Sequence, residues 1–273
     1  MSTNATILQS KPMASGREAE IFEYSEGRVL RLIRHAATAA AVEREVAAMR
    51  AVRSVVPFVP EVFETVVIDG RPGIVMERVA GSDLLSVMAS RPWMVGRIGA
   101  TMGQLHARLH DVVAPLEVES LVKRTRHLAT REDRVPRRIL DWALPQFEEM
   151  PDGDRLLHGD FHPGNILSSA DGPFVIDWAS VTRGNPDADL ARSVLTLQVG
   201  TVPPDSPPIV RYGARFVRRL LVRAYVRAYR RHRAVDTVAL ERWINLRAVD
   251  RLADGIAEER TVLLAILERA MAR

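Results

Sequence analysis

The chain has 273 residues, of which 47% are hydrophobic and 26% are charged, and its formal net charge is +4. These proportions are typical of a globular protein and exclude disordered, collagen-like and coiled-coil chains, while the length suits one large domain or two modest ones. The chain contains no cysteine, which excludes a disulfide scaffold, thiolate metal sites and a cysteine nucleophile.

Neither an export signal nor a membrane span is expected. Residues 1–13 contain no basic segment followed by the apolar stretch of a secretory signal. No part of the sequence approaches the roughly 18 uninterrupted apolar residues of a membrane-spanning helix. We therefore expect a cytoplasmic protein that does not enter a membrane.

The first third of the chain predicts strands interrupted by one helix. Val42, Val46 and Met49 recur four and three residues apart within residues 37–53, which places them on one face of a helix. Turns are predicted at Glu26-Gly27 and Asp69-Gly70. The β-rich runs that these turns and the helix separate are residues 21–24, 29–33, 62–68 and 73–77.

The rest of the chain predicts mostly helices. One helix begins near Ser90 and Pro92, and a second carries Ile139, Ala143 and Phe147 on one face. The first of these helices is marked by the apolar residues Ile98, Met102, Leu105, Leu109 and Val112. Residues 156–176 break the helical period and predict a hairpin, and helices resume from residue 188, interrupted by a loop at 203–208.

The segment with the most specific chemistry reads His-Gly-Asp-Phe-His-Pro-Gly-Asn at 158–165, followed by Ile-Asp-Trp at 176–178. Asp160 and Asn165 have the D-x-x-x-x-N spacing of a kinase catalytic loop, whose carboxylate accepts the proton of an attacking hydroxyl and whose amide oxygen holds a metal ion. Asp177 offers a second oxygen ligand, as Mg²⁺ prefers. Asp and Asn are also common turn residues, but their joint spacing favours phosphoryl transfer.

Together with Gly-Asn-Pro-Asp-Ala-Asp-Leu-Ala at 184–191, these motifs resemble those of the aminoglycoside phosphotransferase and choline kinase-like families. The resemblance covers most of the chain and implies an α+β, two-lobed protein-kinase-like fold that binds ATP or GTP. Residues 1–78 would form a small β-rich amino-terminal lobe. Residues 79–273 would form a large helical lobe with the catalytic loop, the metal site and the acceptor-binding helices.

The resemblance also implies nucleotide-binding residues in the amino-terminal lobe. Residues 15–20 lie where a phosphate-covering loop belongs, although Gly16 is the single glycine in this segment. Residues 76–79 resemble the hinge of a kinase. The backbone of Met76, Glu77 and Val79 is therefore expected to bind the nucleotide base.

An ion pair is expected to support the nucleotide phosphates. Arg31 takes the place of the phosphate-pairing lysine of kinases, and arginine keeps the charge that this role needs. Its partner should be Glu45, which borders the apolar helix face, whereas Glu43 should point towards solvent. The alternative is that Arg31 and Glu45 are two unrelated surface charges.

Two groups of histidines raise the question of a metal site. His106 and His110 stand four residues apart, but without the glutamate of H-E-x-x-H a plain helical pair is favoured. His158, Asp160 and His162 offer the ligands of a metal-dependent hydrolase, although His158 on its own favours a structural role in the loop. A third alternative is a non-catalytic nucleotide-binding scaffold, which the presence of a base and two metal ligands disfavours.

Charge along the carboxy-terminal helices is uneven. Residues 206–235 contain nine arginines and no acid, and we expect most of them on a solvated helix face rather than on an acceptor site or a nucleic-acid surface. Asp250, Asp254 and Glu258 follow at four-residue spacing along one predicted stretch of helix, where an acidic pocket is possible. The charge of the acceptor is thus open.

The function implied is a Mg²⁺-dependent O-phosphotransferase that moves the γ-phosphoryl group of a nucleoside triphosphate to a hydroxyl of a small molecule. Aminoglycosides, other antibiotics, amino alcohols and sugars are the acceptors that the resemblance suggests. Gly159 stands where protein kinases have an arginine before the catalytic Asp, so a phosphorylation-switched protein kinase is not expected.

Overall fold

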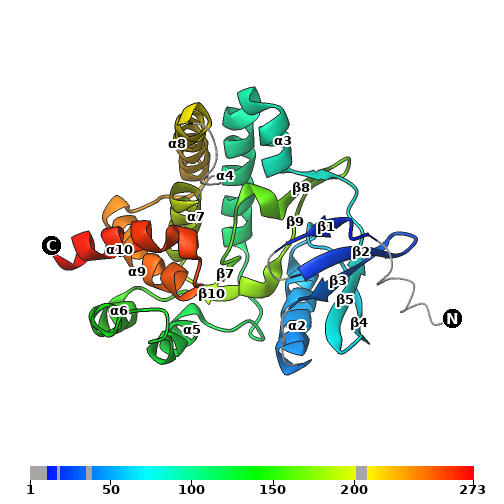
Figure 1. Ribbon diagram of the computed structural model, residues 1–273, viewed down its shortest axis with the longest axis horizontal. Coiled ribbons are helices and arrows are strands. Elements are labelled where there is room, and N and C mark those ends of the chain that lie inside the picture. Colours follow the sequence, from blue (N-terminus) through cyan, green and yellow to red (C-terminus); the bar gives the residue numbers. More distant parts are fainter. Residues whose placement is uncertain (1–10, 17–18, 35–38, 201–207) are drawn as a thin grey trace. The chain divides into compact units, whose positions relative to one another are not determined.

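The computed structural model describes residues 11–16, 19–34, 39–200 and 208–273, and the chain divides into two compact units (Figure 1). The first unit is Met1–Asp83 with Ile166–Ala179, and the second is Leu84–Asn165 with Ser180–Arg273. This division differs from the expected 1–78 and 79–273 in two respects, since the first unit extends to Asp83 and also includes the hairpin. The hairpin groups with the first unit because its strand β8 (Ile166–Ser169) pairs with β6 (Ser82–Asp83).

An antiparallel five-stranded sheet in the order β1-β2-β3-β5-β4 forms most of the first unit. Its strands are β1 (Ala14–Ser15), β2 (Ala19–Ser25), β3 (Arg28–Ile33), β4 (Val62–Ile68) and β5 (Arg71–Glu77). The predicted turn between β4 and β5 has positive φ angles at Asp69 and Gly70, 52° and 74°, as a two-residue hairpin turn requires. β6, β8 and β9 (Gly172–Val175) make a second sheet of three strands.

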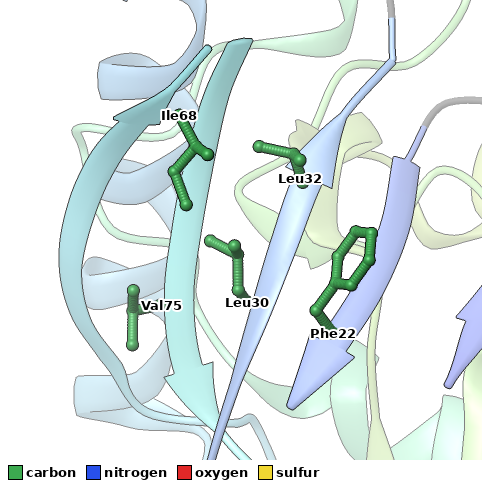
Figure 2. Close-up of a cluster of buried hydrophobic side chains, with 5 residues drawn as sticks. All are labelled: Phe22, Leu30, Leu32, Ile68 and Val75. Atoms are coloured by element: carbon green, nitrogen blue, oxygen red, sulfur yellow. The ribbon is translucent and has the colours of Figure 1, made fainter. Parts of the chain in front are cut away.

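Alternation along β3 directs its side chains to opposite faces of the sheet. Helix α2 (Ala39–Val55) packs against β4 and β5, and the predicted face of Val42, Val46 and Met49 is buried. Arg31 points to the α2 side, whereas its two neighbours in β3 join a cluster on the other face (Figure 2). That cluster consists of Phe22, Leu30, Leu32, Ile68 and Val75.

The second unit is helical, and it contains both helices predicted from apolar spacing. The residues that predicted α4 and α6 are buried, with the exception of the half-buried Val112 just beyond α4. The helices are α3 (Leu84–Ser90), α4 (Val95–Asp111), α5 (Leu121–Arg126), α6 (Arg137–Glu149), α7 (Pro186–Val199), α8 (Pro208–Arg230), α9 (Thr237–Ala253) and α10 (Ala257–Met271). Among the described residues, no helix is long and apolar enough to span a membrane.

Short elements connect these helices. β7 (Arg155–Leu157) pairs with β10 (Thr182–Gly184), and 3₁₀ turns occupy Pro92–Met94, His127–Thr130, Pro163–Asn165 and Trp178–Ser180. The predicted loop at 203–208 lies outside the described residues up to 207, and α8 begins at Pro208. The predicted continuous helix over 250–258 is wrong, because Gly255, with φ +74°, separates α9 from α10.

Candidate functional site

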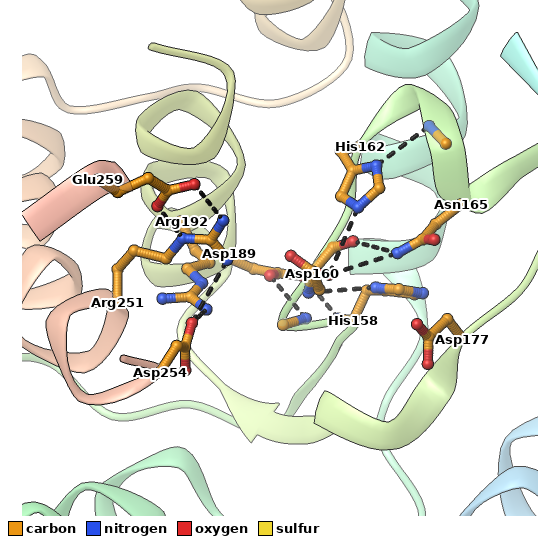
Figure 3. A network of polar contacts seen from close by, with 12 residues as sticks. His158, Asp160, His162, Asn165, Asp177, Asp189, Arg192, Arg251, Asp254 and Glu259 are labelled. Carbon is orange, nitrogen blue, oxygen red and sulfur yellow. Dashed lines mark hydrogen bonds and ion pairs between the residues drawn. The ribbon is translucent and has the colours of Figure 1, made fainter. Parts of the chain in front are cut away.

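The motif at 158–165 forms a loop that follows β7 in the second unit (Figure 3). Gly159 has a φ of +82°, and a Cβ at this position would lie 2.9 Å from the Cβ of Ser180, so both conformation and space require glycine. The backbone N–H of Asp160 donates to His158 Nδ1 (3.2 Å), and that of Gly164 donates to His162 Nδ1 (3.1 Å). Both imidazoles therefore shape the loop.

The same loop does not form the metal centre of a hydrolase. Among the described residues, the one group of three His, Asp or Glu side chains with ligand atoms close enough for an ion is His106, His110 and Asp189. His158, Asp160 and His162 are not such a group, and the Nδ1 atoms of both histidines already accept backbone N–H groups. The geometry thus disfavours the hydrolase alternative.

Asp160 carries an ionised carboxylate, and one of its oxygens is buried without a partner among the described residues. Its Oδ2 lies 3.4 Å from His162 Nε2, while its Oδ1 is buried and has no hydrogen-bond partner among the described residues. Burial by itself would raise the pKa of this carboxyl. The hydrogen bond and charge of His162, with the charges of Arg192 and His158, outweigh burial and hold the pKa well below its usual range.

Asn165 is oriented by the backbone of the same loop. Its Nδ2 donates to the carbonyl oxygen of Asp160 at 2.9 Å, and because a carbonyl can only accept, the amide nitrogen must face it. The side-chain oxygen is therefore the atom left for a ligand. A buried amide oxygen is a suitable ligand for a hard cation such as Mg²⁺.

The carboxylate of Asp189 binds the backbone at the beginning of the loop. Asp189 lies in the first turn of α7, which is capped by Asn185 and begins with Pro186, two residues before the predicted start at 188. Its Oδ2 accepts the N–H of His158 at 2.6 Å, and its Oδ1 accepts that of Gly159 at 2.9 Å. The backbone immediately before Asp160 is thus tied to a fully buried carboxylate.

The two histidines of α4 complete the environment of this carboxylate. His106 Nε2 and His110 Nε2 lie 3.0 and 3.3 Å from Asp189 Oδ2. Burial would raise the pKa of Asp189, but the hydrogen bonds and charges of the two histidines hold it well below its usual range. The predicted plain helical pair is therefore incomplete, since both rings contact a buried acid that also binds the backbone of the loop at 158–165.

His110 predicts a measurable pH dependence of stability. Burial and the neighbouring His106 lower its pKa from 6.5 to about 3, so the folded protein keeps His110 neutral where the unfolded chain protonates it. The unfolded state then binds more protons between these values. We expect the free energy of unfolding to fall by up to about 1.4 kcal/mol per pH unit as the pH drops below 6.5.

Urea denaturation between pH 6 and 4.5 measures this slope. His110→Gln, whose amide can still donate to Asp189, should flatten it, and His232→Gln, at an exposed position after α8, should not. Equal slopes for His110→Gln and the wild type would show that His110 is not the group that titrates.

The predicted ion pair exists in the first unit. Arg31 Nη1 lies 2.7 Å from Glu45 Oε1, and Glu43 is exposed, as the helix face predicts. Arg31 Nη2 also lies 3.3 Å from Asp177 Oδ1, a contact that the sequence did not indicate. Asp177 follows β9 with φ +63°, a conformation that is uncommon for residues other than glycine and that concentrates at functional sites.

The expected phosphate-covering loop and hinge agree less closely with the structure than the ion pair does. The N–H of Gly16 donates to Ala19 O at 2.9 Å, and residues 17 and 18 of the loop lie outside the described residues. At the hinge, Met76 is paired within β5, and the N–H of Glu77 donates to Glu61 O at 2.8 Å. Of the three expected hinge residues, Val79 is the one that lies beyond the sheet.

Two acids of the possible acidic pocket at residues 250–258 pair with arginines. Asp250 pairs with Arg247 at 2.8 Å, and Asp254 Oδ2 pairs with Arg192 at 2.5 Å. Glu258 lies on the separate helix α10. Arginines therefore neutralise two of the three acids.

The arginine-rich helix agrees with a solvated face. Arg215, Arg219, Arg223, Arg227 and Arg231 are all exposed, and the side chain of Arg211 lies outside the described residues. The residues of α8 that are buried belong to its other side and include Leu221, Tyr225, Ala228 and Tyr229.

No sequence motif predicts a role for Asp189 or Arg192. Both are buried within residues 188–197, a run that is otherwise mostly apolar, and a buried charge in such a run needs a partner. This pattern could have indicated that Asp189 and Arg192 are buried and paired, but it does not identify their partners.

The sequence of residues 10–235 matches the phosphotransferase enzyme family. A comparison with curated protein sequences finds no match. Amicoumacin kinase hAmiN is a similar structure, with 14% identity, a TM-score of 0.64, and coverage of 96% of this chain and 87% of that one.

Two aminoglycoside phosphotransferases are also similar in fold. The 3′-phosphotransferase of type VIII has 19% identity and a TM-score of 0.60, with coverage of 93% of this chain and 99% of that one. APH(3″)-Id from Streptomyces rimosus has 19% identity and a TM-score of 0.55, with coverage of 89% and 92%. The α+β, protein-kinase-like fold is thereby confirmed. Because the family match spans most of the chain, the protein belongs to the phosphotransferase enzyme family and is a small-molecule kinase.

Proposed function

We propose that the protein transfers the γ-phosphoryl group of ATP to a hydroxyl of a small molecule, with Asp160 as the catalytic base. The observation that carries this proposal is the buried Oδ1 of an ionised Asp160, which has no partner among the described residues. A buried acceptor without a partner is costly, and a hydroxyl group of a bound acceptor would satisfy it.

The reaction is an in-line displacement. The acceptor oxygen forms a bond to the γ-phosphorus while the bond to the β,γ-bridging oxygen breaks, and the nucleoside diphosphate leaves. The hydroxyl proton passes to Asp160, whose carboxylate is ionised and positioned by the loop. Asp160 also orients the hydroxyl before transfer.

Asn165 and Asp177 are the proposed ligands of Mg²⁺. The amide of Asn165 presents oxygen because its nitrogen faces the loop, and Asp177 offers a carboxylate with 42% of its side chain exposed. When bound, the ion neutralises charge on the β- and γ-phosphates. Arg31 is proposed to bind the α- and β-phosphates, oriented by Glu45 at 2.7 Å.

The remaining nucleotide contacts are proposed from the resemblance to kinases. The backbone of Gly16 would cover the phosphates, and the hinge at Met76, Glu77 and Val79 would hold the base, with Val79 the best placed. ATP is proposed as donor because the amicoumacin kinase structure holds AMP-PNP and the APH(3″)-Id structure holds ADP.

The acceptor is proposed to be an antibiotic, amino alcohol or sugar-like molecule. The kinase named above is bound to Ami, and the aminoglycoside enzyme is bound to streptomycin. A panel of aminoglycosides, other hydroxylated antibiotics, amino alcohols and nucleosides, each with ATP or GTP, tests the proposal by product mass. An 80 Da gain on one acceptor supports it, and no transfer to any acceptor from either nucleotide contradicts it.

Replacing Asp177 with alanine should weaken Mg²⁺-dependent ATP binding by at least about tenfold, or about 1.4 kcal/mol, because a charged ligand of the ion is lost. Calorimetric titration with ATP, with and without Mg²⁺, measures this. Asp171→Ala, at an exposed position in the turn of the same hairpin, is the matched control and should bind as the wild type does. Unchanged Mg²⁺-dependent binding by Asp177→Ala would remove Asp177 from the metal site.

A further inference from the structure

Helices α4 and α8 approach each other unusually closely. A Cβ at Gly99 would lie 2.7 Å from the Cβ of Ala224, and one at Gly103 would lie 2.7 Å from the Cβ of Ala228. Both distances are shorter than real Cβ contacts. Small residues four apart on each helix therefore bring the two backbones together, and the next side chains along the interface must meet.

Those next side chains are a pair of tyrosines and a pair of histidines. The hydroxyl of Tyr225 lies 2.5 Å from His106 Nδ1, and that of Tyr229 lies 2.6 Å from His110 Nδ1. The members of each pair are four residues apart on their own helix. The spacing of one pair therefore matches that of the other.

The directions of these hydrogen bonds follow from Asp189. Its ionised, buried carboxylate can only accept, so His110 donates through Nε2 and, being neutral, accepts at Nδ1. Burial raises the pKa of both Tyr225 and Tyr229, which keeps their hydroxyls protonated as donors. The hydrogen bonds therefore run in one direction: Tyr229 donates to His110 Nδ1, and His110 Nε2 donates to Asp189.

Asp189 and His106 contact the loop on both sides of Asp160. Asp189 binds the two backbone N–H groups that precede Asp160, and His106 stacks on Phe161, which follows it. The ring centroids of His106 and Phe161 are 4.1 Å apart with an angle of 9° between the planes.

We propose that Tyr225 and Tyr229 of α8 are positioning residues, which orient His106 and His110 and through them immobilise the loop that carries Asp160. The catalytic consequence rests on the proposed function. Neither tyrosine touches the reacting groups in this assignment. Helix α8 thereby contributes to turnover through its buried side, while Arg215, Arg219, Arg223 and Arg227 are exposed.

The test is the double variant Tyr225→Phe/Tyr229→Phe, which removes the two hydroxyls and little else. We expect amide hydrogen exchange at His158 and Gly159 to become at least about tenfold faster. We also expect the ¹⁵N shifts of the two imidazoles to move, because Nδ1 loses its donor. For an acceptor found in the panel, kcat should fall by about 10- to 100-fold while the KM for ATP stays within about twofold.

Two controls separate positioning from general stability. Tyr24→Phe makes the same chemical change in β2 of the first unit, and Arg223→Ala alters the exposed side of α8. Both should leave exchange at Gly159 and kcat unchanged.

The proposal is overturned if the double variant keeps wild-type exchange at Gly159. It is overturned equally if exchange rises uniformly across the helices of the second unit, since that reports general destabilisation, or if the loop loosens without a loss of kcat. If the wild type phosphorylates no acceptor, the proposed function fails, while the exchange and imidazole measurements still decide whether the tyrosines hold the loop.

Discussion

Asp160→Asn is expected to lower kcat by about 10²- to 10⁴-fold, the usual contribution of a general base. Asparagine has nearly the same shape but cannot take the proton of the acceptor hydroxyl. Binding of Mg²⁺ and ATP should stay near that of the wild type, because Asp160 is not assigned to the metal or to the nucleotide. Steady-state kinetics with an identified acceptor, together with calorimetric binding of ATP, separates these two effects.

Asp154→Asn, at an exposed position just before β7, is the matched control for this experiment. Because the pKa of Asp160 is held below its usual range, the base stays ionised throughout the mildly acid range. The acid side of the profile of kcat/KM against pH should therefore show no titration of Asp160 above about pH 5. Turnover close to wild type in Asp160→Asn would end its assignment as the base.

Asp189→Asn is expected to cause the largest loss of stability of any substitution considered. Four N–H groups converge on this fully buried carboxylate, two from the loop backbone and two from the imidazoles of α4. An asparagine turns one acceptor atom into a donor that faces other donors. The free energy of unfolding should fall by about 3–5 kcal/mol, as for a buried charged partner that is removed.

Urea denaturation at neutral pH measures the change. Asp187→Asn, in the same first turn of α7 but only partly buried, should change stability by less than about 1 kcal/mol. A loss below about 1 kcal/mol for Asp189→Asn would mean that the loop is held by other contacts. It would also weaken the assignment of the tyrosines of α8.

Local patterns account for what could be predicted of the site. The spacing of Asp160, Asn165 and Asp177 predicts a segment for phosphoryl transfer, because that reaction needs a base and oxygen ligands at set positions along one loop and hairpin. The pairing of Arg31 with Glu45 was also predictable. An apolar helix face must turn towards the sheet, and Glu45 borders that face.

The contacts that could not be predicted join distant parts of the chain. Arg31 and Asp177 are 146 residues apart, and His106 and Tyr225 are 119 residues apart. No local period records such pairs, since they depend on how whole helices and strands pack. The pairing of Asp254 with Arg192 likewise depends on the packing of α7 with α9. Asp250, by contrast, pairs locally with Arg247, three residues earlier on α9.

The sequence by itself determined the class of chemistry, the α+β fold and the order of the longer strands and helices, because periodicity, turn residues and loop motifs act over a few residues. Only the tertiary structure decided that Asp189 anchors the loop at 158–165, that two histidines contact its carboxylate and that two tyrosines contact those histidines. The same holds for Oδ1 of Asp160, which is buried without a partner among the described residues. A buried polar group must find its partner wherever packing places one, and packing is a property of the whole chain.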